Sequence, residues 1–178
     1  ISLAINANGD VFAGTIEGGG VYRSTDNGAS WTLTVNGLDN TYVLALATNA
    51  EGDIFAGTGG SGVYRSTDNG ETWTQATAGI TVPYIFSFAL NADGDIFAST
   101  DLGGGIFRST DNGESWEAVN NGLATSNGIN TVTVTPAGDL FAGSYGDGIF
   151  QSTDNGDSWS QVNNGLTTPF VLSFTTDD

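Results

Sequence analysis

Acid–base chemistry in this chain would have to come from carboxylates. The sequence has 20 aspartates and glutamates and neither histidine nor cysteine, and its three basic residues are all arginines. These counts exclude a Ser-His-Asp or Cys-His nucleophile, a lysine Schiff base, and a metal held by histidine or cysteine. Two carboxylates could still hydrolyse a glycosidic bond, one as a general acid and the other as a base or nucleophile.

The carboxylates that could form such a pair are scattered through the chain. They are Glu17, Asp39, Glu51, Glu71, Asp93, Asp101, Glu114, Glu117, Asp147, Asp157, Asp177 and Asp178. Nothing in their spacing brings two of them together. The segment 91–95 has some ligands of a calcium loop but no closing glutamate, so a type I turn with a bulge is the better interpretation. We therefore predict no catalytic residue, no metal ligand and no cofactor, and we predict that the chain is not an enzyme.

Four other aspartates lie in an eight-residue motif, Ser-Thr-Asp-Asn-Gly-x-Ser/Thr-Trp, that occurs four times. Its tryptophans are the only ones in the chain and follow one another at 42 or 43 residues. Aspartate can accept backbone N–H groups across a turn, glycine can adopt the left-handed conformation, and tryptophan can cover the hairpin. Binding of a metal or a sugar by these aspartates is disfavoured, because a reactive site does not need four identical copies. The residues predicted to be structural are Asp26, Gly28, Trp31, Asp68, Gly70, Trp73, Asp111, Gly113, Trp116, Asp154, Gly156 and Trp159.

Each repeat contains four short strands. In the second repeat they are predicted over 43–47, 54–57, 63–66 and 72–75, with a glycine-rich loop between the second and the third. The first strand is a nearly continuous apolar run, which predicts burial on both faces. No stretch has the 3.6-residue apolar period of a helix.

The motif resembles the Asp-box, or BNR repeat, of sialidase-type propellers and secreted bacterial repeat proteins. The resemblance implies an all-β β-propeller of four-stranded blades, with the box at the hairpin between the third and fourth strands. We predict one domain over 1–178, with repeats at about 1–41, 42–83, 84–127 and 128–169 and a surplus inner strand over 170–178.

Sialidase-type enzymes of this family also hold an anionic sugar with a cluster of arginines. Here Arg23, Arg65 and Arg108 occupy the same position of successive repeats, and Gln151 replaces arginine in the fourth. Positions one blade apart do not converge on one carboxylate. We predict instead that each arginine meets a nearby aspartate or carbonyl group.

The surplus strand suggests a function. An unpaired apolar strand is a template for pairing with another chain. We predict a non-catalytic structural or interaction module that self-associates into an oligomer or a fibre through its terminal strands. The residues predicted to carry the contact are Ile1, Leu3, Phe170, Val171, Leu172 and Phe174.

Three alternatives remain open at this point. The first is a carbohydrate-binding propeller that stacks sugars on Tyr42, Tyr84 or Tyr145. The second is a fragment of a sialidase-like glycoside hydrolase whose catalytic blades are elsewhere. The third is a closed four-bladed scaffold whose extra strand packs on the rim.

Charge limits the partners further. The formal net charge is −17, which disfavours nucleic acid and anionic membrane surfaces, and no apolar run is long enough to span a bilayer. The chain has no lysine, which leaves few sites for trypsin-like proteases, and we expect an extracellular or cell-surface location.

Overall fold

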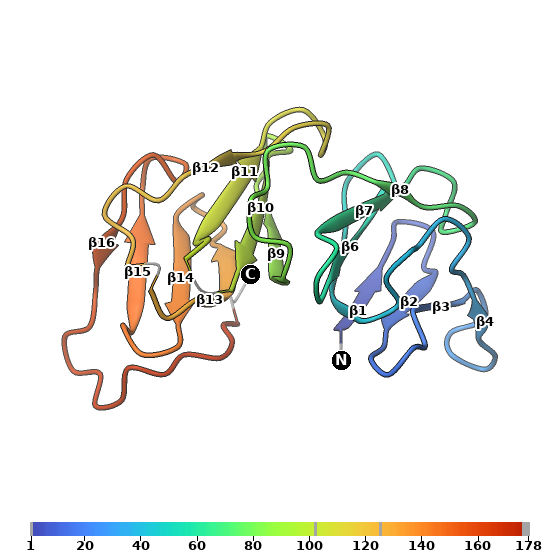
Figure 1. Cartoon of the computed structure of the whole chain (residues 1–178), viewed down its shortest axis with the longest axis horizontal. Coiled ribbons are helices and arrows are strands. Elements are labelled where there is room, and N and C mark those ends of the chain that lie inside the picture. The colour runs from blue at the N-terminus through green and yellow to red at the C-terminus, as the bar shows by residue number, and fades with distance from the viewer. Residues whose placement is uncertain (1, 102, 125, 176–178) are drawn as a thin grey trace. The chain divides into compact units, whose positions relative to one another are not determined.

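A computed structural model describes residues 2–101, 103–124 and 126–175 (Figure 1). These residues form sixteen strands and no helix. The strands form four antiparallel sheets of four strands each, and in every sheet the strands lie side by side in sequence order. The predicted all-β fold of four-stranded blades is confirmed. Each sheet is called a blade below and is numbered in chain order.

The blades have the following strands. The first blade has β1 (Ser2–Ile5), β2 (Val11–Gly14), β3 (Val21–Ser24) and β4 (Thr32–Leu33). The second has β5 (Val43–Thr48), β6 (Ile54–Thr58), β7 (Val63–Ser66) and β8 (Thr74–Gln75). The third has β9 (Ile85–Leu90), β10 (Ile96–Thr100), β11 (Ile106–Ser109) and β12 (Glu117–Ala118). The fourth has β13 (Ile129–Val134), β14 (Leu140–Ser144), β15 (Ile149–Ser152) and β16 (Ser160–Gln161).

The chain divides into two compact units. The first unit comprises Ile1–Thr77 with Pro83–Ile85, and the second comprises Ala78–Val82 with Phe86–Asp178. Each unit contains two consecutive blades and has its own apolar core. The first core includes Phe12, Val21, Leu46, Ile54, Tyr64 and Trp73. The second includes Phe97, Ile106, Ile129, Leu140, Phe150 and Trp159. That the whole chain forms a single domain stays a prediction.

In the second and third blades, burial on both faces belongs to the second strand and not to the first, so the burial predicted for the first strand was wrong. Every residue of β6 and β10 is buried, whereas β5 and β9 contain both buried and half-buried residues. β6 and β10 are inner strands of their sheets, whereas β5 and β9 form sheet edges; β2, an inner strand of the first blade, alternates between half-buried and buried residues. A long apolar run therefore does not identify the most buried strand.

The fourth strand is shorter than predicted, because the box tryptophan is not part of it. In the second blade the strand begins at Thr74, and the Trp73 N–H donates to the carbonyl of Asn36 at 2.8 Å. This hydrogen bond joins Trp73 to the segment that follows the first blade. The Trp159 N–H makes the same bond, to the Asn121 carbonyl at 2.8 Å. The tryptophan backbone thus connects two blades.

The segment 170–175 was predicted to be a surplus strand. Phe170 forms an isolated bridge with Tyr145, and the Val171 N–H donates to the Ser144 carbonyl at 3.0 Å. Residues 171–175 belong to no sheet. The segment therefore lies against β14 of the fourth blade and is called the tail below. The rest of the predicted strand, 176–178, is outside the described residues, as is Ile1.

Candidate functional site

The box aspartate closes its own turn. In the first blade Asp26 accepts hydrogen bonds from the Ser24 hydroxyl at 2.8 Å, from the Ser30 N–H at 2.8 Å and from the Ser30 hydroxyl at 2.6 Å. The Ser24 hydroxyl accepts in turn from the Gly28 N–H at 2.8 Å. The other three boxes repeat these bonds with their own residues. Both carboxylate oxygens are therefore occupied within the turn.

These bonds favour the ionised carboxylate. The hydroxyl of Ser30 lowers the pKa of Asp26 to about 2, and that of Ser158 does the same for Asp154. The pKa values of Asp68 and Asp111 are also lowered, chiefly by the hydroxyls of Thr72 and Ser115. A carboxylate with so low a pKa is a poor general acid at neutral pH. The box geometry is that of a turn and not of a reactive centre.

The box asparagine connects neighbouring blades, a role that the sequence analysis missed. Asn69 has a φ of 61° and the next residue, Gly70, has a φ of 84°, so two consecutive residues are left-handed. The turn projects the Asn69 side chain to the first blade, where its amide donates to Asp10 at 2.7 Å and its oxygen accepts from Asn6 at 2.8 Å.

The second unit repeats this contact. Asn155 donates to Asp95 at 2.7 Å and accepts from Asn91 at 2.9 Å. The sequence contains a signal for this contact. A second motif, Gly-Asp-x-Phe-Ala, occurs once in every repeat, at 9–13, 52–56, 94–98 and 138–142, and its aspartate recurs together with the box asparagine.

The box tryptophan also docks on the preceding blade. The Trp73 Nε1–H donates to the Thr34 carbonyl at 3.1 Å, and the Trp159 Nε1–H donates to the Val119 carbonyl at 2.8 Å. Trp73, Trp116 and Trp159 are 3%, 5% and 5% exposed, whereas Trp31 is 42% exposed. The expectation that the tryptophan covers its own hairpin missed this larger contact.

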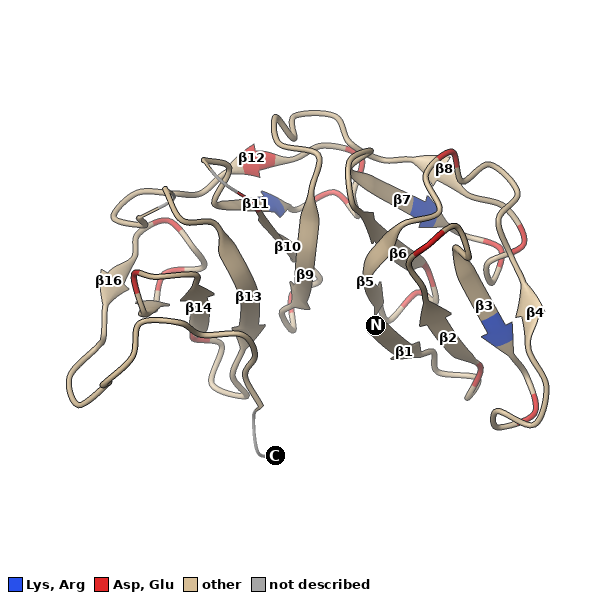
Figure 2. Cartoon of the chain, turned by 60° about the horizontal axis from the view of Figure 1, so that its bottom comes forward, with Lys and Arg blue, Asp and Glu red and all other residues tan. Residues whose placement is uncertain are grey.

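Each arginine meets carboxylate or carbonyl groups. Figure 2 shows basic residues on β3, β7 and β11 and acidic ones mostly in the turns. Arg23 donates to the Asn69 carbonyl at 2.6 Å and pairs with Glu71 at 2.8 Å. Arg65 pairs with Asp53 at 2.7 Å. Arg23 and Arg65 lie on different sheets of the first unit, and Arg108 lies on a sheet of the second.

Arg108 repeats the contact of Arg23 in the second unit. It donates to the Asn155 carbonyl at 2.7 Å and pairs with Asp157 at 2.9 Å and with Glu117 at 2.6 Å. In both units, then, an arginine of one blade binds the box of the following blade.

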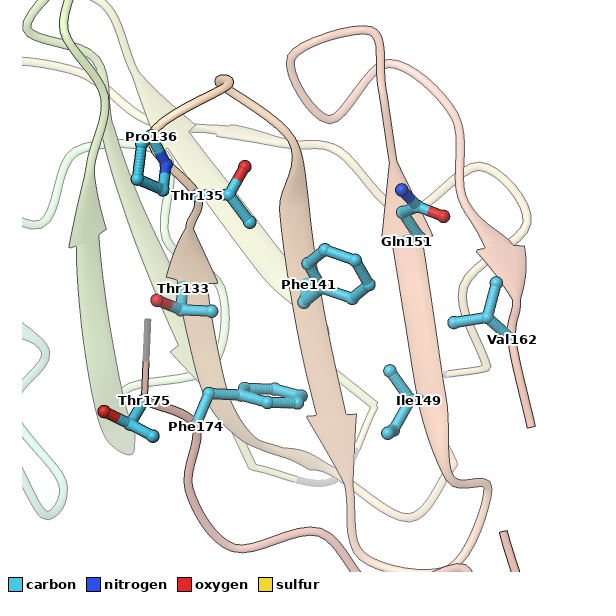
Figure 3. Close-up of a pocket in the computed structure, with 9 residues that line it drawn as sticks. All are labelled: Thr133, Thr135, Pro136, Phe141, Ile149, Gln151, Val162, Phe174 and Thr175. Atoms are coloured by element: carbon cyan, nitrogen blue, oxygen red, sulfur yellow. The ribbon is translucent and has the colours of Figure 1, made fainter. Parts of the chain in front are cut away.

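A pocket of about 620 Å³ lies on the face of the fourth blade (Figure 3). Figure 3 shows the Phe174 ring directed toward Phe141, with Ile149, Gln151 and Val162 along the opposite side. The centroids of the two phenylalanine rings are 6.3 Å apart. Gln151 donates to Asp139 at 3.2 Å. The pocket is lined by Thr133, Thr135, Pro136, Phe141, Ile149, Gln151, Val162, Phe174 and Thr175.

The residues predicted for self-association fall into two groups. Leu3 in β1 and Leu172 in the tail are 70% and 69% exposed, and Phe170 is 55% exposed. Val171 and Phe174 are half-buried against the fourth blade. The tail therefore presents one apolar edge to solvent and packs the other on its own blade.

The aromatic residues predicted for sugar contact belong to both units. Tyr42 and Tyr84, which are 41% and 45% exposed, both flank the Gly59–Gly60 loop in the first unit. Tyr145 lies in the second unit, 57% exposed, with its ring edge against Phe170 at a centroid distance of 5.1 Å. The structure thus brings two of the three tyrosines together.

Within the residues that the structure describes, no group of three or more acidic side chains could hold a metal ion. The same residues contain no helix that could cross a membrane.

Comparison with known proteins confirms the resemblance stated from the sequence. The family model described as BNR/Asp-box repeat matches residues 22–33, 64–75 and 107–118. The fourth box, 152–159, is not among the matched segments, although it makes the same hydrogen bonds. No curated protein sequence matches the chain.

Solved structures similar to this chain include an ancestral GH74 enzyme, with 27% identity and a TM-score of 0.72 over 88% of the chain. The GH74 xyloglucanase from Xanthomonas campestris matches with 20% identity and a TM-score of 0.70 over 89% of the chain. The extracellular domain of a protein assigned to a hybrid two component system of B. thetaiotaomicron matches with 15% identity and a TM-score of 0.73 over 96%.

The chain spans 22%, 29% and 24% of the lengths of these three proteins. The chain is built of Asp-box repeats that fold into propeller-type blades. In length it corresponds to about a quarter of each of these larger proteins.

Proposed function

We propose that this chain is a non-catalytic, extracellular interaction module that self-associates through its terminal blades. The observation that carries the proposal is the contrast between equivalent residues. Leu46 is 8% exposed because it packs in the core of the first unit, whereas Leu3, its equivalent in β1, is 70% exposed. Apolar side chains that stay exposed on a terminal blade favour an interface.

The chemistry of the repeated residues supports a module without catalysis. Every box aspartate is engaged by the hydroxyl and backbone groups of its own turn. The arginines are engaged by carboxylate and carbonyl groups. These side chains stabilise the blades and have no free group directed at a substrate.

The extracellular assignment is supported by the comparisons and the composition. One of the similar structures is an extracellular domain. The chain contains no cysteine, so an oxidising compartment would not change its covalent structure.

Sedimentation velocity over a range of concentrations tests the proposal. We expect the intact chain to form dimers or longer species as its concentration rises, and a variant that lacks residues 170–178 to associate more weakly. An intact chain that stays monomeric up to millimolar concentration would contradict self-association.

Carbohydrate binding is a second candidate, favoured by one observation. Tyr42 and Tyr84 flank a loop of two glycines, and the amide of Asn40 reaches the same loop, donating to the Gly59 carbonyl at 3.4 Å. Exposed aromatic rings next to a polar amide can stack on a sugar. Two of the similar structures are GH74 enzymes, one of them a xyloglucanase.

A glycan array followed by calorimetry tests this second candidate. We expect Tyr42→Ala to abolish binding and Tyr145→Ala, on the other unit, to leave it unchanged. Hydrolysis of fluorogenic glycosides by the intact chain would instead favour a glycosidase fragment and would overturn the non-catalytic assignment.

A further inference from the structure

We propose that the pocket on the fourth blade binds the Asp-box of the first blade of a second copy of this chain. The inference rests on the self-association proposed above and names the surfaces that make the contact. The two surfaces are the pocket around Phe141 and the box hairpin that carries Asn27 and Trp31.

The pocket is built from the positions that receive a box inside each unit. Phe141 in β14 corresponds to Phe12 in β2, which lies against Gly70 of the second box. Phe97 in β10 has the same relation to Gly156 of the fourth box. In the proposed contact Phe141 would therefore face Gly28 of the first box.

The indole contact has a corresponding position as well. Val162 of the fourth blade corresponds to Thr34 and Val119, whose carbonyl groups accept from Trp73 and Trp159. The indole of Trp31 would insert along Val162 in the same way. Burying this ring, now 42% exposed, supplies the apolar part of the interface.

A polar contact positions the box. Asp139 corresponds to Asp10 and Asp95, each of which accepts from a box asparagine at 2.7 Å. Asp139 accepts from Gln151 on its own blade and has a second oxygen for the amide of Asn27. Asn27 already has the left-handed conformation of the docked boxes, with a φ of 57°.

Charge complementarity identifies the partner as this chain's own first box. Within the units, an arginine of the receiving blade pairs with an acid of the incoming box: Arg23 with Glu71, and Arg108 with Asp157.

The pocket of the fourth blade lacks the arginine of this pair, and the box of the first blade lacks the acid. The receiving position on the fourth blade is Gln151, and the acid position of the first box is Ala29. A box with an acid would place that charge next to Asp139 with no arginine to balance it. The uncharged Gln151 of the pocket therefore suits the uncharged Ala29 of the first box, just as Arg23 and Arg108 suit the acids of the boxes that they receive.

The tail supplies the strand that goes with the box. The Val43 N–H of β5 donates to the Thr15 carbonyl of the first blade, and the Val171 N–H of the tail donates to the equivalent carbonyl of Ser144. The tail thus lies against the fourth blade as β5, the first strand of the second blade, lies against the first blade. β1 pairs with β2 along its whole length in the first blade. For an incoming first blade to dock with β2 to β4, its β1, which carries the exposed Leu3 and Ile5, would give up this pairing and the tail would take its place.

Complementary charge substitutions test the proposal. Ala29→Glu puts an acid into the exposed box, and Gln151→Arg restores the arginine that the first and third blades carry at this position. We expect Ala29→Glu alone to weaken association about tenfold, as an unbalanced interfacial charge does. We expect an equimolar mixture of Ala29→Glu chains with Gln151→Arg chains to associate at least as tightly as the intact chain. Thr81→Glu, at an exposed site outside both surfaces, is the charge control and should change nothing.

The outcomes separate this inference from the proposed function. An intact chain that never associates contradicts both. Association that Ala29→Glu and Trp31→Ala leave unchanged contradicts only the pocket and box. A third outcome is that Gln151→Arg reverses the effect of Ala29→Glu when both are in one chain, but not when they are in separate chains of the mixture. That result means that the box closes on its own chain, and it overturns the second copy as occupant.

Discussion

The first and second boxes have nearly the same sequence but different surroundings. Trp73 of the second box is 3% exposed and donates from its indole to the first blade, whereas Trp31 of the first box is 42% exposed. The side chain of Asn69 binds Asp10, and Asn27 has the same backbone conformation. The comparison teaches that the motif encodes two functions at once. The aspartate closes a turn within the blade, and the asparagine and the tryptophan join that blade to another.

Tryptophan substitution should separate the two environments most strongly. We expect Trp73→Ala to lower the free energy of unfolding by about 3–5 kcal/mol, because it leaves a cavity and removes the bond to the Thr34 carbonyl. The same change at Trp31 should cost about 1 kcal/mol or less. Urea unfolding of dilute protein measures both. Equal losses would show that the two boxes have equivalent surroundings, against the structure.

Two glycines allow the same comparison at the segment after the fourth strand. Gly37 and Gly165 have φ values of 86° and 85°. A Cβ atom on Gly37 would lie 2.2 Å from the Trp73 carbonyl oxygen, whereas one on Gly165 would meet nothing within 4 Å.

We expect Gly165→Ala to cost about 1 kcal/mol for backbone strain alone. Gly37→Ala should cost at least about 2 kcal/mol more, because the blades must move apart. Thermal unfolding gives the difference, and a Gly165→Ala loss as large as that of Gly37→Ala would mean that the fourth blade is covered as the first is.

Replacing Arg23 by glutamine, the residue that the fourth blade has at this position, should have a smaller effect. Arg23→Gln makes the first blade resemble the fourth and removes the bond to the Asn69 carbonyl and the pair with Glu71. Because Glu71 is largely exposed, we expect a loss of about 1 kcal/mol, most of it from the hydrogen bond. Glu71→Gln should cost less than Arg23→Gln in the same unfolding measurement. The reverse order would assign the stability to the ion pair.

The response to acid should have the same direction in all boxes, because the pKa of every box aspartate is lowered by hydrogen bonds within its own turn. The pKa of Asp26 and Asp154 is lowered from 3.8 to about 2 in the fold. A lowered pKa contributes stability above the unfolded value, and this contribution is lost as the pH falls from about 4 through 2. Unfolding between pH 5 and pH 2 should therefore show a smaller acid dependence in Asp26→Asn than in the intact chain. An unchanged slope would contradict the role of the carboxylate in the turn.

Much of the blade could be predicted from the sequence because its signals are local. Asp, Asn and Gly mark the turns, and apolar residues between them mark strands whose bounds differ little from those expected. The third strand of the second blade, Val63–Ser66, has the predicted bounds. Burial was predicted less well, because it depends on the position of a strand in its sheet. The strand 43–48 has the longer apolar run, but 54–58 is the more buried.

The contacts between blades could not be derived from one repeat alone. The indole of Trp73 binds a carbonyl 39 residues earlier in the chain, and no local pattern specifies such a pair. Departures from the repeat also carry information. Ala29 and Gln151 are the positions where the charged pair is absent, and both lie on terminal surfaces.

The central claim, that the exposed box of the first blade is an unoccupied contact surface, is tested most directly by quenching of tryptophan fluorescence with acrylamide at increasing protein concentration. Three of the four tryptophans are buried within the chain itself, so the quenchable signal reports Trp31. We expect this signal to decrease as the chain associates, and to be absent at every concentration in Trp31→Phe. A quenchable fraction that stays constant while the chain associates would contradict the claim.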